Sequence, residues 1–318
     1  MDVQVYKFGG VAVGSAEALQ RAVERAGKAE TPLAIVVSAM NGVTDLLLGA
    51  AEAAVKRDRT RATAALDEFQ RRHEAVVDQI FTSKRSAAPL KATISRASAE
   101  LRAMTESIAV LAELTPRASD AIVARGELLL AGIFVELLAA SSIDAELVDP
   151  QQVIFTERRL GSVWPSFAKC ERAAKKILRP ILDSGRIAVV PGFLGSGPDG
   201  ELVTLGRGGS DLSAAILGRS LSAASVTLFK EVDGLMTADP AAVPQARVIP
   251  ELHYREAAEL AYYGAKILHP RTIIPLADRG WVSVHSVIAE KNYWEVVDQL
   301  KRAGAEGILV LPIDQMFN

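Results

Sequence analysis

The residues best suited to chemistry lie in one segment, which reads TLGRGGSD at 204–211. Its glycines let backbone N–H groups approach an anion closely, and the apolar helix expected after it adds a favourable potential at its N-terminus. Arg207 can bind a carboxylate or a phosphate through two hydrogen bonds. Ser210 and Asp211 are candidate helix caps, and Asp211 could also hold a metal or orient a substrate. The segment therefore predicts a site for a negatively charged small molecule.

Two lysines lie close to further glycines. Lys7 precedes Gly9 and Gly10 at the end of the first expected strand, and Lys266 lies in the segment GAKILHP at 264–270. An ammonium group beside accessible backbone N–H groups can hold phosphate oxygens. Neither the P-loop pattern nor the glycine pattern of dinucleotide-binding sites is present. Taken alone, Lys7 with its two glycines is better explained as a tight turn.

Hydroxyl and carboxyl groups mark two further segments. Ser38 and Thr44 lie in SAMNGVTD at 38–45, directly after the second expected strand. They could bind a small polar ligand or serve the local turn and helix cap. Glu127 follows Gly126 in an apolar helical stretch, where a carboxylate is unusual. It could bind the ammonium group of a ligand or pair with a neighbouring arginine, and the sequence leaves both open.

A strand end at 230–234 carries Lys230, Glu231 and Asp233. Acidic residues beside a phosphate-binding loop can position Mg²⁺ or ribose hydroxyls, although Asp233 before a glycine is also an ordinary turn. The histidines lack the spacing of metal ligands, so no metal site made of protein ligands is predicted. His269, before a proline, is better explained as a structural residue than as a catalytic one. Cys170 is expected to be a packed thiol.

These segments need a scaffold that brings strand ends together. Apolar runs alternate with helical stretches, which predicts an α/β fold with a mainly parallel sheet. Strands are expected at 3–8, 33–38, 143–149, 187–193, 225–234, 281–287 and 307–313. Helices are expected at 17–28, 119–140 (capped by Ser119), 162–183 (opened by Ser162 and Pro165), from 210 or 211 onward, and at 255–263, 271–279 and 292–303. A helical excursion from the sheet is expected at about 45–115, with a break near 82–90.

Composition narrows the class of protein. The chain has 318 residues, of which 49 % are hydrophobic and 23 % charged, as is typical of a soluble globular protein. A formal net charge of −2 disfavours a nucleic-acid partner, and a single cysteine excludes an internal disulfide. Apolar runs of about 18 residues are missing, so no membrane span is expected. The acidic start is unlike a signal peptide. We therefore expect a cytoplasmic enzyme.

Taken together and in this order, the segments resemble the catalytic domain of aspartate kinases, in the amino acid kinase family. The matching segments are KFGG (7–10), VVSAMNGVTD (36–45), RGE (125–127), PGF (191–193), TLGRGGSD (204–211), VDG (232–234), TADP (237–240) and ELAYYGAKILHPRT (259–272). The resemblance implies a three-layer αβα sandwich with a mainly parallel sheet. It also implies ATP and Mg²⁺ as cofactors and phosphorylation of the β-carboxylate of L-aspartate to aspartyl phosphate.

The resemblance also implies a role for each candidate residue. Lys7 would contact the transferring phosphoryl group and Asp211 would orient the reacting end, as the catalytic residues. Glu127 would meet the α-ammonium group of aspartate and Arg207 its α-carboxylate. The whole aspartate pocket would consist of Ser38, Thr44, Glu127, Arg207 and Ser210. The nucleotide would lie at Gly9, Gly10, Lys230, Glu231, Asp233 and Lys266. Because a carboxylate acceptor is already ionised at neutral pH, the reaction requires no general base.

The resemblance suggests how the chain is divided. An amino-acid-binding N-terminal lobe is expected at 1–195, a nucleotide-binding lobe at 196–287 and a short tail at 288–318. The segment 281–317 resembles the C-terminal segment of ATP phosphoribosyltransferase, and the ACT domains usual in aspartate kinases are not expected. The expected partners are a small-molecule substrate, L-aspartate or a related amino acid, and a second copy of the chain in a homodimer. Neither nucleic acid nor a membrane is expected as a partner.

Three sites depart from the family pattern. Val11 and Ala12 replace the threonine and serine common after the glycines, Ala241 replaces an arginine, and Met236 replaces an aromatic residue. These differences leave two alternatives open. One is a kinase of the same fold that acts on another amino acid or small acid. The other is a catalytically weak regulatory subunit that binds an amino acid.

Overall fold

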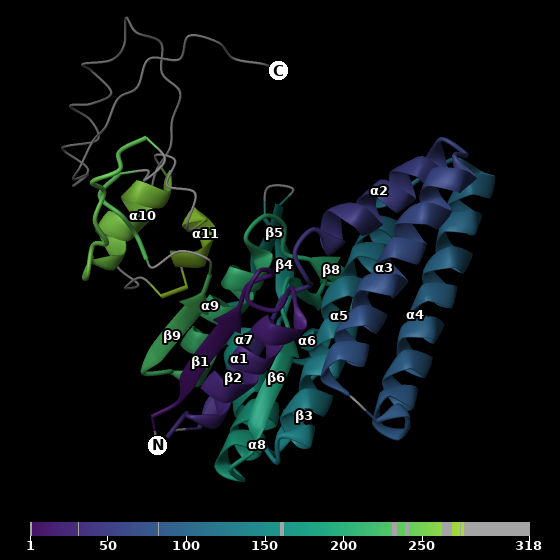
Figure 1. The fold of residues 1–318 in the computed structure, drawn as a ribbon. Helices are drawn as coiled ribbons and strands as arrows, with labels where there is room; N and C mark the ends of the chain where they lie inside the picture. Colours follow the sequence, from purple (N-terminus) through teal and green to yellow (C-terminus); the bar gives the residue numbers. More distant parts are fainter. Residues whose placement is uncertain are drawn as a thin grey trace, which may run out of the picture. The chain divides into compact units, whose positions relative to one another are not determined.

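The strands expected at 3–8 and 33–38 lie side by side within the central sheet. The computed structural model describes residues 2–30, 32–81, 83–159, 162–230, 234–238, 242–262, 269–273 and 275–276. In this part of the chain the sheet has the order β3 (Ala145–Leu147), β6 (Ile187–Pro191), β2 (Leu33–Val37), β1 (Gln4–Phe8) and β9 (Ser225–Phe229). All neighbouring strands are parallel, so their carboxyl ends meet at one edge (Figure 1).

Helices connect these strands. The described helices are α1 (Ala16–Gly27), α2 (Val43–Val55), α3 (Arg59–Ile80), α4 (Lys84–Leu111), α5 (Pro116–Ala140), α6 (Pro150–Val153), α7 (Phe167–Ala173), the π-helical turn η1 (Ala174–Leu178), α8 (Arg179–Asp183), α9 (Gly209–Leu221), α10 (Tyr254–Tyr262) and α11 (Pro270–Ile273). Two antiparallel hairpins complete the described elements, β4 (Thr156–Arg159) with β5 (Ser162–Pro165) and β7 (Leu194–Ser196) with β8 (Leu202–Thr204).

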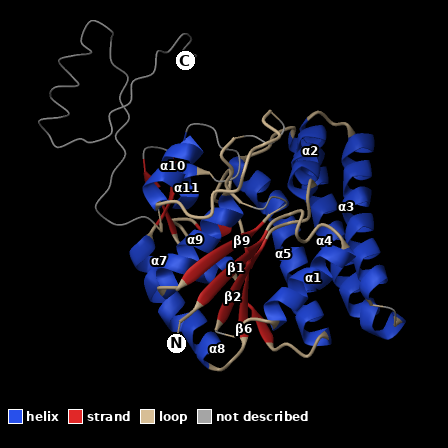
Figure 2. Cartoon of the chain, turned by 60° about the vertical axis from the view of Figure 1, so that its left-hand side comes forward, coloured by secondary structure: helices blue, strands red, loops and turns tan. Residues whose placement is uncertain are grey.

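Strand β2 shows why helices cover both faces of the sheet. Its residues Leu33, Ile35 and Val37 pack into an apolar cluster with side chains of α1 and α5. Ala34 and Val36 belong to a second cluster with side chains of α7, α8 and α9, which includes the buried thiol predicted at 170. Successive side chains of a strand point to opposite faces, so a strand that is apolar throughout needs a layer on each side. Figure 2 shows the two helical layers, and the predicted αβα sandwich is confirmed.

The predicted helical excursion consists of α2, α3 and α4, which pack on one another and on α5. The expected break is confirmed, because α3 ends at Ile80 and α4 begins at Lys84, and Pro89 lies inside α4. Ser83 is the N-cap of α4, and its hydroxyl accepts the Ser86 N–H at 3.4 Å. A second break, not predicted, precedes α3, where the Asp58 carboxylate accepts the Arg61 N–H at 3.0 Å.

Two predicted helix starts are wrong. Helix α5 is capped by Thr115, whose hydroxyl accepts the Ala118 N–H at 3.2 Å, rather than by Ser119. Pro116 then occupies the first helical position, where its missing N–H costs nothing. The expected start at 162–165 is strand β5, because these residues pair with β4, and the helix begins only at α7.

The strands and helices expected at 281–287, 292–303 and 307–313 lie outside the described residues. Residues 1–277 form one compact unit, and its division into two lobes near 195 stays a prediction. No described helix is both long enough and apolar enough to span a bilayer.

Candidate active site

The carboxyl edge of the sheet gathers many of the predicted site residues. Those that directly follow a strand are Gly9, Gly10, Ser38 and Lys230. The Ser38 N–H donates to the Phe8 carbonyl at 3.2 Å, and the Gly9 N–H donates to the Phe229 carbonyl at 3.1 Å. These bonds hold the ends of β2, β1 and β9 together at the edge where open parallel sheets bind ligands.

Asp211 lies between two lysines. One oxygen of its carboxylate lies 2.6 Å from Lys7 Nζ, and the other lies 2.7 Å from Lys230 Nζ. Lys7 belongs to β1, Lys230 follows the neighbouring strand β9, and Asp211 lies in the first turn of α9. Lys7 is 6 % exposed and Asp211 is 5 % exposed. This charge cluster of Lys7, Asp211 and Lys230 carries a net positive charge at a helix N-terminus, which suits an anionic ligand.

The lysines keep Asp211 ionised. Burial on its own would raise the pKa of Asp211, but the charges of Lys7 and Lys230 and their hydrogen bonds lower it below its ordinary value of 3.8. In return the ionised carboxylate holds both ammonium groups in place. A phosphate arriving here would meet cations that are already oriented, which is how charge stabilisation is most effective.

Glu127 is a second buried carboxylate. Helix α5 approaches the segment after β2 closely at Gly126, where a Cβ atom would lie 2.9 Å from the Ala39 Cβ. The neighbouring Glu127 is 3 % exposed and accepts a hydrogen bond from the Ala39 backbone, but its Oε2 has no hydrogen-bond partner. Of the two possibilities for Glu127, an ion pair with the neighbouring Arg125 is not observed, and Arg125 pairs with Glu100 at 3.0 Å instead.

Burial raises the pKa of Glu127 from its ordinary value of 4.5 to about 7. The hydrogen bond from the Ala39 backbone and the positive charge of Lys7 oppose this shift only partly. A buried carboxylate without a full set of partners is stabilised by an added cation. An ammonium group on a ligand would supply that cation.

The 204–211 loop forms a defined turn. The Leu205 N–H donates to the Phe193 carbonyl at 2.8 Å, and the Gly209 N–H donates to the Gly206 carbonyl at 2.9 Å. Gly208 has a left-handed φ of 69° and is the N-cap of α9. The predicted capping by Ser210 or Asp211 is therefore wrong, and the Asp211 carboxylate pairs with lysines instead.

The remaining predicted pocket residues are Arg207, Ser210 and Thr44. Arg207 is exposed, where an incoming ligand can reach it. Ser210 lies close to the end of β6. A Cβ atom on Gly192, the residue after this strand, would lie 2.8 Å from the Ser210 Cβ. Thr44 is half-buried in the first turn of α2. The structure thus places Ser210 at the end of β6, and the membership of Ser210 and Thr44 in an aspartate pocket stays a prediction.

Glu231, Asp233 and Lys266 lie outside the described residues, as does Ala241. Met236 forms an isolated antiparallel bridge with Val248. The contribution predicted for Lys266 therefore stays a prediction. Lys230 supplies the second cation at Asp211.

Sequence reasoning did not single out Arg271. Its guanidinium donates to the Leu205 carbonyl at 3.1 Å and to the Val163 carbonyl, and it lies 5.6 Å from the centre of the Trp164 ring. Its backbone N–H donates to His269 Nδ1 at 3.3 Å, in keeping with a structural role for that histidine. Arg271 links the 204–211 loop to β5 through one backbone carbonyl of each, which no residue pattern reveals.

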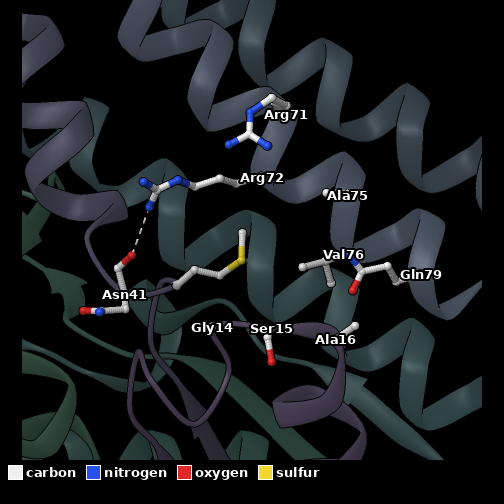
Figure 3. Close-up of a pocket in the computed structure, with 10 residues that line it drawn as sticks. Gly14, Ser15, Ala16, Asn41, Arg71, Arg72, Ala75, Val76 and Gln79 are labelled. Carbon is white, nitrogen blue, oxygen red and sulfur yellow. Dashed lines mark hydrogen bonds between the residues drawn. The ribbon is translucent and has the colours of Figure 1, made fainter.

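A cavity of about 190 Å³ lies beside the loop after β1 (Figure 3). It is lined by Gly14, Ser15, Ala16, Met40, Asn41, Arg71, Arg72, Ala75, Val76 and Gln79. Both arginines pair with Glu68 at 2.7 Å, and Arg72 also donates to the Asn41 carbonyl at 3.2 Å. The cavity holds none of the predicted site residues, and Arg72 holds α3 against the loop after β2.

Comparison with known proteins identifies the family. The profile of the amino acid kinase family matches residues 2–288. This chain belongs to the amino acid kinase family. A second profile, the HisG C-terminal domain, matches residues 268–315, in agreement with the similarity noted for the tail.

Several aspartokinases are similar to this amino acid kinase. Lysine-sensitive aspartokinase 3 of Escherichia coli is 34 % identical over 279 residues, which cover 86 % of this chain and 59 % of that protein. The crystal structure of E. coli aspartokinase III with aspartate and ADP matches with a TM-score of 0.78 and 33 % identity over 86 % of this chain and 59 % of the other. The Clostridium acetobutylicum aspartate kinase, at 24 % identity over 87 % of this chain and 57 % of the other, shares the fold with a TM-score of 0.67. The chain thus spans about 59 % of the length of its E. coli relative.

Proposed function

We propose that this chain transfers the γ-phosphoryl group of ATP to the β-carboxylate of L-aspartate, forming aspartyl phosphate and ADP. The observation that carries the proposal is the charge cluster of buried Lys7, buried Asp211 and half-buried Lys230 at the carboxyl edge of the sheet. The solved E. coli relative is described as a complex with aspartate and ADP, which supports both ligand classes.

The two buried carboxylates, Asp211 and Glu127, have different roles in the proposed reaction. Asp211 orients Lys7 and Lys230, which would meet the phosphate oxygens of the nucleotide. Glu127, with its unpartnered Oε2, would bind the α-ammonium group of aspartate. Arg207 would bind the α-carboxylate through two hydrogen bonds. Ser38, Thr44 and Ser210 would complete the aspartate pocket, and Gly9 and Gly10 would lie beside the transferring group.

The chemical step needs position and charge more than proton transfer. An oxygen of the ionised β-carboxylate attacks the γ-phosphorus, the bond from phosphorus to the β–γ bridging oxygen breaks, and that oxygen leaves on ADP. A carboxylate with a pKa of about 3.9 requires no general base at neutral pH. Charge that builds up on the phosphoryl oxygens is stabilised by the ammonium groups of Lys7 and Lys230.

Mg²⁺ belongs to this proposal through the nucleotide. The described ranges contain no group of three or more His, Cys, Asp or Glu side chains that could hold a metal ion, and both Asp211 oxygens face lysines. Because Mg²⁺ is often bound largely by substrate phosphates and water, it would enter with ATP. The described residues do not fit a separate protein-built metal site, so we assign no ligand to the ion.

Trapping the acyl phosphate tests the proposal. The chain is incubated with ATP, Mg²⁺ and hydroxylamine, and with L-aspartate or a panel of other amino acids and small acids, while ADP and hydroxamate are measured. We expect hydroxamate that depends on aspartate. If hydroxamate forms only with another acid, that acid is the substrate instead of aspartate. If aspartate binds but no ADP is released, the chain is a binding subunit and not a kinase.

A further inference from the structure

A hydrogen bond links the two sides of the proposed aspartate pocket. The Thr204 hydroxyl donates to Asp120 Oδ1 at 2.8 Å. Thr204 is the last residue of β8 and precedes Arg207 by three positions, whereas Asp120 lies in α5. The contact joins residues far apart in the sequence, directly before the loop that carries Arg207.

Asp120 and Glu127 lie on one face of α5. They are seven positions apart, which is close to two helical turns and about 10 Å along the axis. The helix is fixed near Glu127 by the close contact of Gly126 with Ala39. Near Asp120 it is fixed to β8 by the bond to Thr204. Helix α5 thus carries one pocket residue and holds the strand that leads to another.

The residues that follow Thr204 are held by further contacts, so their position depends on the position of Thr204. The β7–β8 hairpin, the bond from the Leu205 N–H to the Phe193 carbonyl and the bond from Arg271 to the Leu205 carbonyl leave little freedom after Thr204. A shift of β8 away from α5 would therefore displace Arg207 relative to Glu127.

We propose that the hydrogen bond between Thr204 and Asp120 is a positioning contact that sets the spacing of Glu127 and Arg207 and thereby the affinity for the amino acid. This inference rests on the proposed function, in which Glu127 and Arg207 hold the two ends of one α-amino acid group. Thr204 and Asp120 act through these residues and do not touch the ligand.

Steady-state kinetics test the proposal with the substitution Thr204→Val, which keeps the shape and removes the donor. We expect the KM for aspartate to rise about tenfold, as for one lost hydrogen bond to a carboxylate, with kcat and the KM for ATP within about twofold of the original chain. Thr204→Ser restores the hydroxyl and is expected to recover most of the affinity. An unchanged KM for aspartate, equal rises of both KM values, or failure of the serine variant to recover would each overturn the proposal.

The matched control is Thr105→Val, because the Thr105 hydroxyl donates to the Leu101 carbonyl within α4 at 3.0 Å. This variant is expected to lose stability without a change in the KM for aspartate. Amide hydrogen exchange at 205–209 in the unliganded protein gives a readout that needs no substrate. We expect exchange at least tenfold faster in Thr204→Val than in the Thr105 variant, and equal exchange refutes the positioning contact. If the original chain does not phosphorylate aspartate, the proposed function fails while this exchange result still decides the contact.

Discussion

The pKa of Glu127 predicts how the affinity for aspartate depends on pH. Burial raises this pKa to about 7, and an ammonium group binds the ionised carboxylate. The unliganded site is then roughly 10 % ionised at pH 6 and roughly 90 % ionised at pH 8. The β-carboxylate and the ammonium group of free aspartate keep their charges over this range. We therefore expect kcat/KM for aspartate to rise about tenfold between pH 6 and pH 8.

The assay is coupled ADP release at subsaturating aspartate, repeated with Glu127→Gln. The amide cannot ionise, so this variant should show a low kcat/KM with no rise between pH 6 and pH 8. A flat profile for the original chain, or the same rise in the variant, would refute the assignment of Glu127 to the ammonium group.

The same ionisation affects stability, with a sign that can be checked. The pKa of Glu127 is higher in the folded chain than its ordinary value of 4.5, so folding favours the protonated form. The stability that depends on this proton is present below about pH 4.5 and is lost as the pH rises to about 7. Glu127→Gln should therefore stabilise the unliganded protein by about 3 kcal/mol at pH 8 and by about 1 kcal/mol at pH 5. Urea unfolding at the two pH values measures the difference.

Three further predictions concern single side chains. Lys7→Ala should lower kcat by at least about 100-fold, because a positive charge at the transferring phosphoryl group is lost. Circular dichroism should show an intact fold, because Asp211 keeps its ion pair with Lys230. An unchanged kcat in the hydroxamate assay would show that Lys7 has no part in the reaction. Arg207→Ala should raise the KM for aspartate about 30-fold, equivalent to about 2 kcal/mol, with little change in Tm because the residue is exposed; an effect confined to the KM for ATP would assign Arg207 to the nucleotide. Burial lowers the pKa of His73 to about 4, so stability should fall by about 2 kcal/mol as the pH falls from 8 to 5, and His73→Leu should lose this part of the pH dependence in urea unfolding.

The sheet could be predicted because its signal is local. A strand that is buried on both faces is apolar throughout, and LAIVV at 33–37 shows this directly. The pairing of β4 with β5 could not be predicted in the same way, because Ser162 and Pro165 are good residues for starting a helix. Pairing with β4 determines their conformation, and this pairing cannot be recognised from the residues of β5 alone.

The site was predictable in its residue types but not in its pairings. Lysines and glycines at strand ends indicate an anion site wherever the strands lie. That Asp211 pairs with both Lys7 and Lys230 depends on β9 lying next to β1, which only the strand order reveals. The same pairing explains why Asp211, a good capping residue, leaves the N-cap of α9 to Gly208. Arg271 and Asp120 could not be identified from the sequence, because each forms a hydrogen bond with a residue far away in the chain.

The placement of β9 beside β1 also has a consequence for the order in which the molecule assembles. Gln4 pairs with Ser225, so β1 waits for one of its two neighbours until the intervening residues 5–224 have been made. Its other neighbour, β2, follows almost at once, and the residues that surround Glu127 are complete long before Lys230 is synthesised. During synthesis the surroundings of Glu127 can therefore be in place while one of the two cations beside Asp211 does not yet exist. Nascent chains that end before β9 would be unable to complete this charge cluster, however well their helices had packed.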